Sequence, residues 1–304
     1  MTTVTRSCES VGPVRAIGSI AMKELERQAF RTLHQEGCFV IPNPWDVGSA
    51  RYLQHLGFKA LATTSAGFAF SQGLPDSEVA VSRDRSLAHI GEIATAVDLP
   101  VNADFASGYG IEPQDVADSV SRCVATGVAG LSIEDATGDP SAPLYDLSFA
   151  VERIRAARHA IDESGGDVLL TARAECYHVG YADPFPETVL RLQAYSQAGA
   201  DVLFAPGPHK PQDIRALVEA VRPKPFNLLV VRDIGLDASD IAALGVRRIS
   251  IGGALALSAW TGFIRAAQKL KSDGSFAGLA ALTSYADINE LFAADLQARL
   301  ARVV

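Results

Sequence analysis

The feature that most constrains the fold is a unit that recurs eight times between residues 38 and 270. Each unit is a short apolar run rich in β-formers, followed by a loop of Gly, Pro, Ser, Asp or Asn and then an amphipathic helical segment. The predicted strands are CFVIPN (38–43), ALATTS (60–65), PVNADF (100–105), GLSIED (130–135), LLTARAE (169–175), VLFAPG (202–207), FNLLVV (226–231) and RRISIGG (247–253). Short, nearly continuous apolar runs of this kind are typical of parallel strands covered by helices.

Eight successive units predict an α/β protein with a (β/α)8 TIM barrel rather than an open doubly wound sheet. The open sheet predicts a G-x-G-x-x-G turn after the first strand, where this sequence reads NPWDVG. Several helical segments end in glycine just before the next strand, as left-handed C-caps do. Of the 304 residues 48% are hydrophobic, which is enough to fill the core of one large domain.

The chain divides into three segments by pattern. Residues 1–20 are polar and lack periodicity, and we expect a flexible N-terminal arm there. Residues 21–273 hold the predicted catalytic barrel. Residues 274–304 carry two short helical patterns that a barrel does not require, and this tail either packs on a neighbouring subunit or covers its own barrel.

Composition excludes several classes of partner. The formal net charge is −8, whereas nucleic acids and anionic membrane surfaces attract clustered Lys and Arg. No apolar stretch reaches the roughly 20 residues needed to span a bilayer, and the N-terminal residues lack the apolar centre of a signal peptide. We therefore expect a cytoplasmic protein that binds neither nucleic acid nor membranes.

Polar side chains cluster where three successive predicted strands end. They are Asn102 and Asp104, Glu134 and Asp135, and Arg173 and Glu175. The carboxyl ends of barrel strands share one face, so four carboxylates would converge there and raise each other's pKa unless a cation intervenes. Oxygen ligands without His or Cys clusters favour a hard ion, Mg²⁺ or Mn²⁺. Asp135 alternatively caps the following helix.

Other residues at these ends suit an acidic substrate. Arg173 offers a planar fork for a carboxylate or phosphonate, although it alternatively forms a structural ion pair with a neighbouring acid. The small residues Thr64, Ser65 and Ala66 would let backbone N–H groups approach an anionic oxygen, unless they form an ordinary loop. Asn227, on the seventh run, is a further candidate for substrate binding.

The sequence resembles the isocitrate lyase/phosphoenolpyruvate mutase superfamily. The matching segments are GFKAL-TTSAG (57–67), GLPD (73–76), NADFASGYG (102–110), GVAGLSIED (127–135), TARAE (171–175), GADVLFAPG (199–207) and GVRRISIGGALA (245–256). The resemblance implies a (β/α)8 barrel with Mg²⁺ at the strand ends. It also implies a homotetramer, built from dimers that exchange the last barrel helix.

The resemblance also implies roles for single residues. Asp104 and Asn102 match the D-x-D metal pair of the family, with Asn102 in place of the usual first acid, and Glu134 would hold the metal through water. Arg173 would clamp the acidic head of the substrate, and the N–H groups of residues 64–66 would hold its other end. Asp76 matches an acid near the reacting centre.

The loop after the fourth run departs from the family pattern. Lyases of the family carry K-[KR]-C-G-H there, but SIEDATGDPSAPLYDLSFAVERI contains no Cys, His or Lys, and the Asn-rich motif of the mutases is also missing. Tyr145 is a candidate acid in this loop, or a packing residue. The resemblance therefore implies an Mg²⁺-dependent enzyme that forms an enolate of a small 2-oxo or 2-hydroxy carboxylate and cleaves a C–C bond. The alternatives are P–C chemistry on a phosphonate and a non-catalytic 2-oxo acid binder.

Overall fold

The computed structural model describes residues 13–301, with side chains from residue 21 onward, and it is built on eight parallel strands. They are β1 (Phe39–Ile41), β2 (Leu61–Ala62), β3 (Val101–Asp104), β4 (Gly130–Glu134), β5 (Leu169–Arg173), β6 (Val202–Phe204), β7 (Phe226–Leu229) and β8 (Arg248–Ser250). Their order is β1-β8-β7-β6-β5-β4-β3-β2. The Ala62 N–H donates to the Pro42 carbonyl at 3.0 Å, which joins β2 to the end of β1. The predicted (β/α)8 barrel is confirmed.

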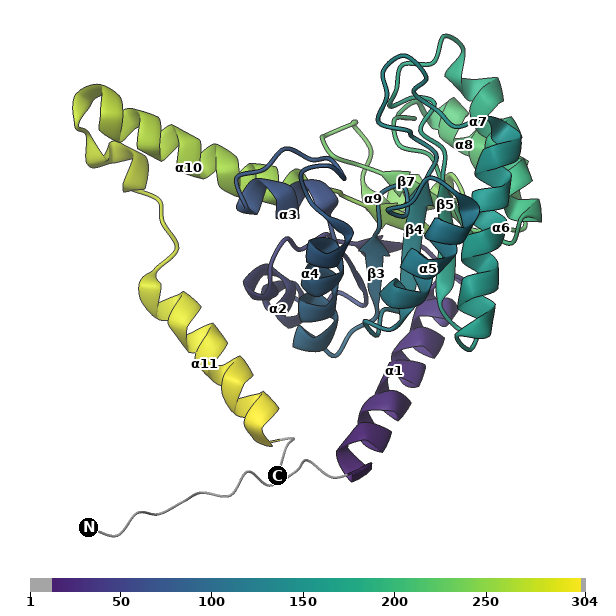
Figure 1. Cartoon of the computed structure of the whole chain (residues 1–304). Helices are drawn as coiled ribbons and strands as arrows, with labels where there is room; N and C mark the ends of the chain where they lie inside the picture. Colours follow the sequence, from purple (N-terminus) through teal and green to yellow (C-terminus); the bar gives the residue numbers. More distant parts are fainter. Residues whose placement is uncertain (1–12, 302–304) are drawn as a thin grey trace.

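Helices cover the outside of the barrel (Figure 1). They are α2 (Val47–His55), α4 (Arg83–Ala96), α5 (Pro113–Val124), α6 (Leu147–Glu163), α7 (Pro184–Gln197), α8 (Pro211–Val221) and α9 (Ala238–Ala243), while the short α3 (Ser65–Ser71) follows β2. Their apolar residues recur at helical spacing, as Val116, Val120 and Cys123 do in α5, and this stripe is buried in the core.

Alternation along the strands separates an apolar layer from a polar interior. Leu131 and Ile133 of β4 belong to the hydrophobic core, whereas Ser132 and Glu134 line a cavity inside the barrel. Successive side chains of a strand point to opposite faces, so the run GLSIE supplies residues to both the apolar layer and the polar interior. The polar residues at the strand ends therefore face the barrel axis.

Both ends of the chain add helices to the barrel. Helix α1 (Pro13–Leu33) begins inside the segment 1–20 for which we expected an arm, and residues 1–12 lie outside the described part. Its Phe30 is fully buried in an apolar cluster with Leu169 and Val202, the first residues of β5 and β6. Helix α10 (Ala254–Asp273) extends away from the barrel, followed by η1 (Phe276–Leu279) and α11 (Tyr285–Ala301) (Figure 1). In residues 13–301 we find no helix with the length and apolarity to cross a membrane.

Candidate active site

A cavity of about 1010 Å³ lies at the carboxyl ends of the strands. Ten lining residues are those predicted from the sequence: Thr64, Ser65, Ala66, Asp76, Asn102, Asp104, Glu134, Tyr145, Arg173 and Asn227. The barrel thus brings the whole predicted set to one cavity, of a size typical of small-molecule sites. Their individual roles remain predictions.

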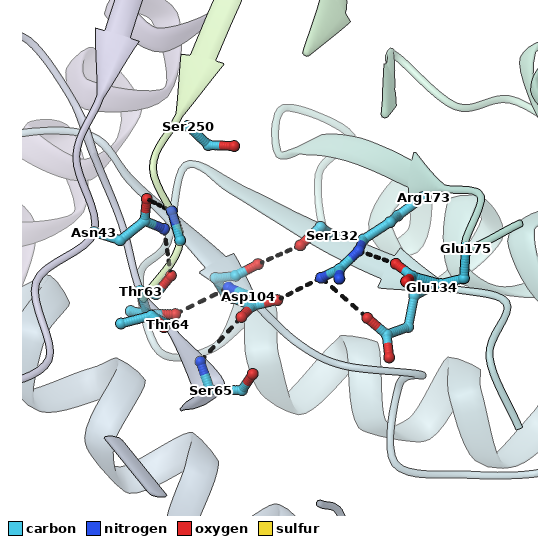
Figure 2. A network of polar contacts seen from close by, with 12 residues as sticks. Asn43, Thr63, Thr64, Ser65, Asp104, Ser132, Glu134, Arg173, Glu175 and Ser250 are labelled. Atoms are coloured by element: carbon cyan, nitrogen blue, oxygen red, sulfur yellow. Dashed lines mark hydrogen bonds and ion pairs between the residues drawn. The ribbon is translucent and has the colours of Figure 1, made fainter. Parts of the chain in front are cut away.

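Arg173, the last residue of β5, lies between three carboxylates (Figure 2). Its Nη1 is 3.1 Å from Glu134 Oε2 and 3.7 Å from Asp104 Oδ1, and its Nε contacts Glu175 Oε1. Glu134 and Arg173 are register partners on β4 and β5, which places the two side chains next to each other. Arg173 thus makes the ion pairs with neighbouring acids that the sequence left as the alternative to substrate binding.

Three carboxyl groups surround the single guanidinium of Arg173. Burial is the main reason that the pKa of Glu134 rises to about 8, and Glu175 and Asp104 raise it further while Arg173 opposes the shift. Burial and then Asp104 also raise the pKa of Asp76 above its ordinary value. A divalent cation would relieve this repulsion, so the site has the electrostatics of a cation-binding centre.

The donor set fits Mg²⁺ with few protein ligands. Asp104 and Glu134 both contact Nη1 of Arg173, so their oxygens face a common region. Across residues 21–301 no group of three His, Cys, Asp or Glu side chains is already arranged to hold a metal. Mg²⁺ commonly binds one or two carboxylates and keeps several waters, which suits this pair.

Asn102 has its amide oxygen directed to another partner. Its Oδ1 lies 3.5 Å from Nη1 of Arg248, and its Nδ2 donates to the Ala103 carbonyl at 3.1 Å. The side chain is almost fully buried. In this orientation the amide oxygen predicted to bind the metal is used by Arg248.

The turn from β2 into α3 supplies backbone donors to the cavity. Thr64 caps α3, and its Oγ1 accepts from the Gly67 N–H at 3.1 Å. The Ser65 N–H donates to Asp104 Oδ2 at 2.9 Å, and the Ala66 N–H has no partner among the described residues. A Cβ on Gly67 would lie 2.6 Å from Cγ2 of Thr64, so the turn requires glycine there. Because the Ala66 N–H is unpartnered within the described residues, it can donate to an anion in the cavity.

Tyr145 lies on the cavity wall and also packs in the loop. The guanidinium carbon of Arg153 is 4.2 Å from the centre of its ring, and its backbone carbonyl accepts from Arg191 at 2.9 Å. The ring also neighbours Phe149 of α6. Both predictions for Tyr145 therefore stay open, since a packed ring can still present its hydroxyl to the cavity.

Sequence reasoning missed Arg248, at the start of β8. It is 3% exposed, and burial lowers its pKa to about 9. It donates to Asn227 Oδ1 at 2.7 Å and to Thr171 Oγ1 at 3.0 Å, while Asn227 donates to Ser250 Oγ at 2.9 Å. Asn227 is thus held at both ends of its amide. The signal in the sequence was the alternation of RRISIGG, which puts Arg248 and Ser250 on the same face.

Asp135 belongs to a buried network rather than to a helix cap. It accepts from the Tyr195 hydroxyl at 2.6 Å, from Arg191 Nη1 at 3.0 Å and from the Glu175 N–H at 2.8 Å. The N-cap position of α6 is occupied instead by Asp146, whose side chain forms no capping hydrogen bond. Asp135 therefore positions the backbone of Glu175 from outside the cavity.

The chain is similar to a protein-family model, to curated relatives and to solved structures. The family model described as phosphoenolpyruvate phosphomutase matches residues 30–271. An uncharacterized protein of Mycobacterium tuberculosis strain H37Rv is 34% identical over 225 residues, which cover 74% of this chain and 81% of the relative. A crystal structure of a candidate lyase/mutase from Burkholderia cenocepacia J2315 is 44% identical, with a TM-score of 0.85 over 90% of this chain and 97% of that chain.

Two further solved structures belong to enzymes that catalyse different reactions. A 2,3-dimethylmalate lyase is 27% identical, with a TM-score of 0.78 over 92% of this chain and 98% of that chain. A phosphonopyruvate hydrolase in complex with oxalate and Mg²⁺ is 26% identical, with a TM-score of 0.79 over 91% of this chain and 98% of that chain. Similar barrels thus serve both a lyase and a hydrolase.

Proposed function

Because the chain belongs to the phosphoenolpyruvate phosphomutase family, as the sequence resemblance predicted, we propose that it is an Mg²⁺-dependent enzyme that cleaves a C–C bond of a small 2-oxo or 2-hydroxy acid. The observation that carries the proposal is the placement of Arg173 beside Asp104 and Glu134 in the carboxyl-end cavity. Cleavage of such a bond leaves an electron pair on carbon, which must be delocalised into an enolate. Fixed positive charge and hydrogen-bond donors beside the enolate oxygen usually stabilise it.

Asp104 and Glu134 would hold the metal, with Asn102 as a proposed outer contact. When bound, Mg²⁺ supplies positive charge beside the developing enolate oxygen. Arg173 stays protonated, because Glu175, Glu134 and Asp104 raise its pKa against the effect of burial. Its fork would hold the substrate carboxylate, and the Ala66 N–H would donate to the far end of the substrate.

Two residues are candidates for moving a proton. The raised pKa of Asp76 lets this carboxyl take up a proton more readily than an ordinary aspartate. Tyr145 lines the same cavity from the loop that lacks the family's Cys motif. In an oxaloacetate-type decarboxylation, CO₂ leaves and solvent protonates the enolate; in retro-aldol cleavage of a substituted malate, the hydroxyl loses a proton as the C–C bond breaks.

The test is turnover of oxaloacetate and of 2- and 3-alkylmalates by the purified protein with Mg²⁺. We expect 2-oxo acid product above the uncatalysed rate, lowered by about 100-fold or more in Arg173→Met, because a charged substrate contact is lost. Arg155→Met removes an exposed arginine of α6 and should retain activity. No turnover of any of these acids by the wild-type protein would refute C–C cleavage.

The similarity to phosphonopyruvate hydrolase favours P–C cleavage as the second candidate. Phosphorus NMR with phosphonopyruvate distinguishes the two, because a cleaved phosphonate gives a shifted resonance. Tight oxalate binding by calorimetry without turnover of either substrate class would instead identify a 2-oxo acid binder.

We also propose that the chain assembles as a homotetramer built from two dimers, with α10 exchanged between the subunits of each dimer. Trp260, Phe263 and Ile264 of this helix are between 37% and 62% exposed, and the helix projects from the barrel (Figure 1). Apolar side chains on a projecting helix need a partner surface. Sedimentation equilibrium should give four times the chain mass of 32.1 kDa, and a monomer would refute the exchange.

A further inference from the structure

A second cavity, of about 820 Å³, opens at the opposite end of the barrel. Its walls include the residues where strands begin: Cys38 before β1, Leu169 and Val202 at the starts of β5 and β6, and Arg247 before β8. Cavities of this volume hold small molecules. The amino-terminal face of a barrel usually serves stability, so a cavity here lies apart from the candidate active site.

Three cationic residues from different parts of the chain line this cavity. Arg31 comes from α1, Lys224 from the loop before β7 and Arg247 from the turn before β8. Arg31 donates to the Asp167 carbonyl at 3.1 Å and Arg247 to the Gly37 carbonyl at 2.8 Å. Among the described residues, none of the three cations forms an ion pair with a carboxylate. Their charges are therefore left without an anion.

The acid in the cavity wall does not neutralise them. Asp201 accepts from Arg158 Nη1 at 2.9 Å and from the Leu170 N–H at 2.9 Å, so its charge is already matched. A further lining cation, Arg222, pairs with Glu219 at 3.0 Å on the surface. The chain as a whole carries a net charge of −8, so a cavity with surplus positive charge is a local reversal of its field.

His34, in the wall of the cavity, is polar but uncharged. His34 donates from Nδ1 to the Phe30 carbonyl at 2.8 Å, and its Nε2 lies 3.3 Å from Nη1 of Arg248. Burial, and behind it Arg248, lowers the pKa of His34 to about 3, so the ring is neutral and accepts from Arg248. The guanidinium of Arg248 therefore stands behind this wall and adds to the positive field of the cavity.

We propose that this cavity binds a small multiply charged anion, a phosphate group that is either free or carried by a metabolite, through Arg31, Lys224 and Arg247. One arginine is enough for a single carboxylate, whereas two guanidinium forks and an ammonium match the charge and the several acceptor oxygens of a phosphate. The site is independent of the reaction proposed for the carboxyl-end cavity.

The test is a calorimetric titration of the full chain with inorganic phosphate in low-salt, phosphate-free buffer. We expect one saturable site per chain. The double variant Lys224→Met/Arg247→Met should bind phosphate about tenfold or more weakly, because it loses charge-assisted hydrogen bonds. The matched control Lys210→Met/Arg215→Met removes the same two residue types from exposed positions of the α8 segment, and its affinity should match that of the wild type.

The carboxyl-end cavity also contains an arginine, so the titration is repeated with saturating Mg²⁺ and oxalate. Phosphate binding that persists there, and is lost in the double variant, supports the proposal. Binding that oxalate abolishes and the double variant retains places phosphate beside Arg173 and overturns it, as does the absence of saturable binding.

Thermal melting and gel filtration check that the variants fold. If the double variant does not, Lys224→Gln replaces it, since this change leaves the bond from Arg247 to Gly37 in place. We then expect phosphate affinity to fall by about threefold or more, because one charged hydrogen-bond donor is lost. Unchanged phosphate affinity in a folded Lys224→Gln variant overturns the proposal.

Discussion

Binding of Mg²⁺ should expel a proton from Glu134 near neutral pH. Burial, assisted by Glu175 and Asp104, raises the pKa of Glu134 to about 8 in the metal-free protein. A carboxyl group with that pKa is about 90% protonated at pH 7, and carboxylates bind metals only when deprotonated. Each Mg²⁺ ion bound at pH 7 should therefore release about 0.9 proton.

The same pKa sets the size of the pH dependence. The deprotonated fraction of Glu134 rises from about 1% at pH 6 to about 90% at pH 9, so the apparent Mg²⁺ affinity should rise about ninetyfold over this range. Most of the rise should occur below pH 8. The effect of pH on folding has the opposite sign. The folded chain keeps a proton on Glu134 that the unfolded chain releases, so the metal-free protein should lose stability as the pH rises from 4.5, the ordinary pKa of a glutamate, toward 8.

Calorimetry in two buffers of different ionisation enthalpy, from pH 6 to pH 9, measures both quantities. The dependence of the observed enthalpy on the buffer gives the number of protons released, and the titrations give the affinity. Glu134→Gln should bind Mg²⁺ more weakly and without this pH dependence, whereas Glu163→Gln, an exposed residue of α6, should behave like the wild type. Wild-type Mg²⁺ affinity that stays constant from pH 6 to pH 9 would refute the reasoning.

Three further substitutions test other parts of the site. Asp135→Asn weakens the buried acceptor of an arginine and a tyrosine, and should lower the free energy of unfolding in urea by about 3–5 kcal/mol; a loss below about 1 kcal/mol would contradict the network. Gly67→Ala puts a methyl group against the threonine that caps α3 and should cost about 1–3 kcal/mol by the same assay, whereas Gly91→Ala, in α4, meets only Thr126 Cβ at 3.8 Å and should not destabilise. Tyr145→Phe keeps the ring contacts and should lower kcat by about 100-fold with KM maintained if the hydroxyl moves the proton; an unchanged kcat would identify a packing residue.

The eight repeated units in the sequence determined the barrel and the face on which its site lies. Parallel strands end at a common face, so residues at the ends of β3, β4 and β5 meet there whatever the loops between them do. Asp104, Glu134 and Arg173 were predicted in this way, and the structure places them in contact. Strand alternation is a local property of the chain, and it is readable from the sequence for the same reason.

Contacts across the barrel were decided only by the tertiary structure. Arg248 reaches Asn102, Thr171 and Asn227 on three other strands, and this depends on the register and closure of the whole sheet. No pattern within one segment specifies which side chains face each other across the axis. The sequence therefore predicted Asn102 as a metal ligand and Asn227 as a substrate-binding residue, but not the buried Arg248 that contacts both.

The cavity at the amino-terminal end shows the same limit. Its three unneutralised cations lie far apart in the sequence, at Arg31, Lys224 and Arg247, and each on its own resembles an ordinary surface charge. Only closure of the barrel, with α1 packed beneath it, brings them to one cavity. Periodicity along a chain predicts elements and their ends, whereas the meeting of distant charges depends on how those elements pack.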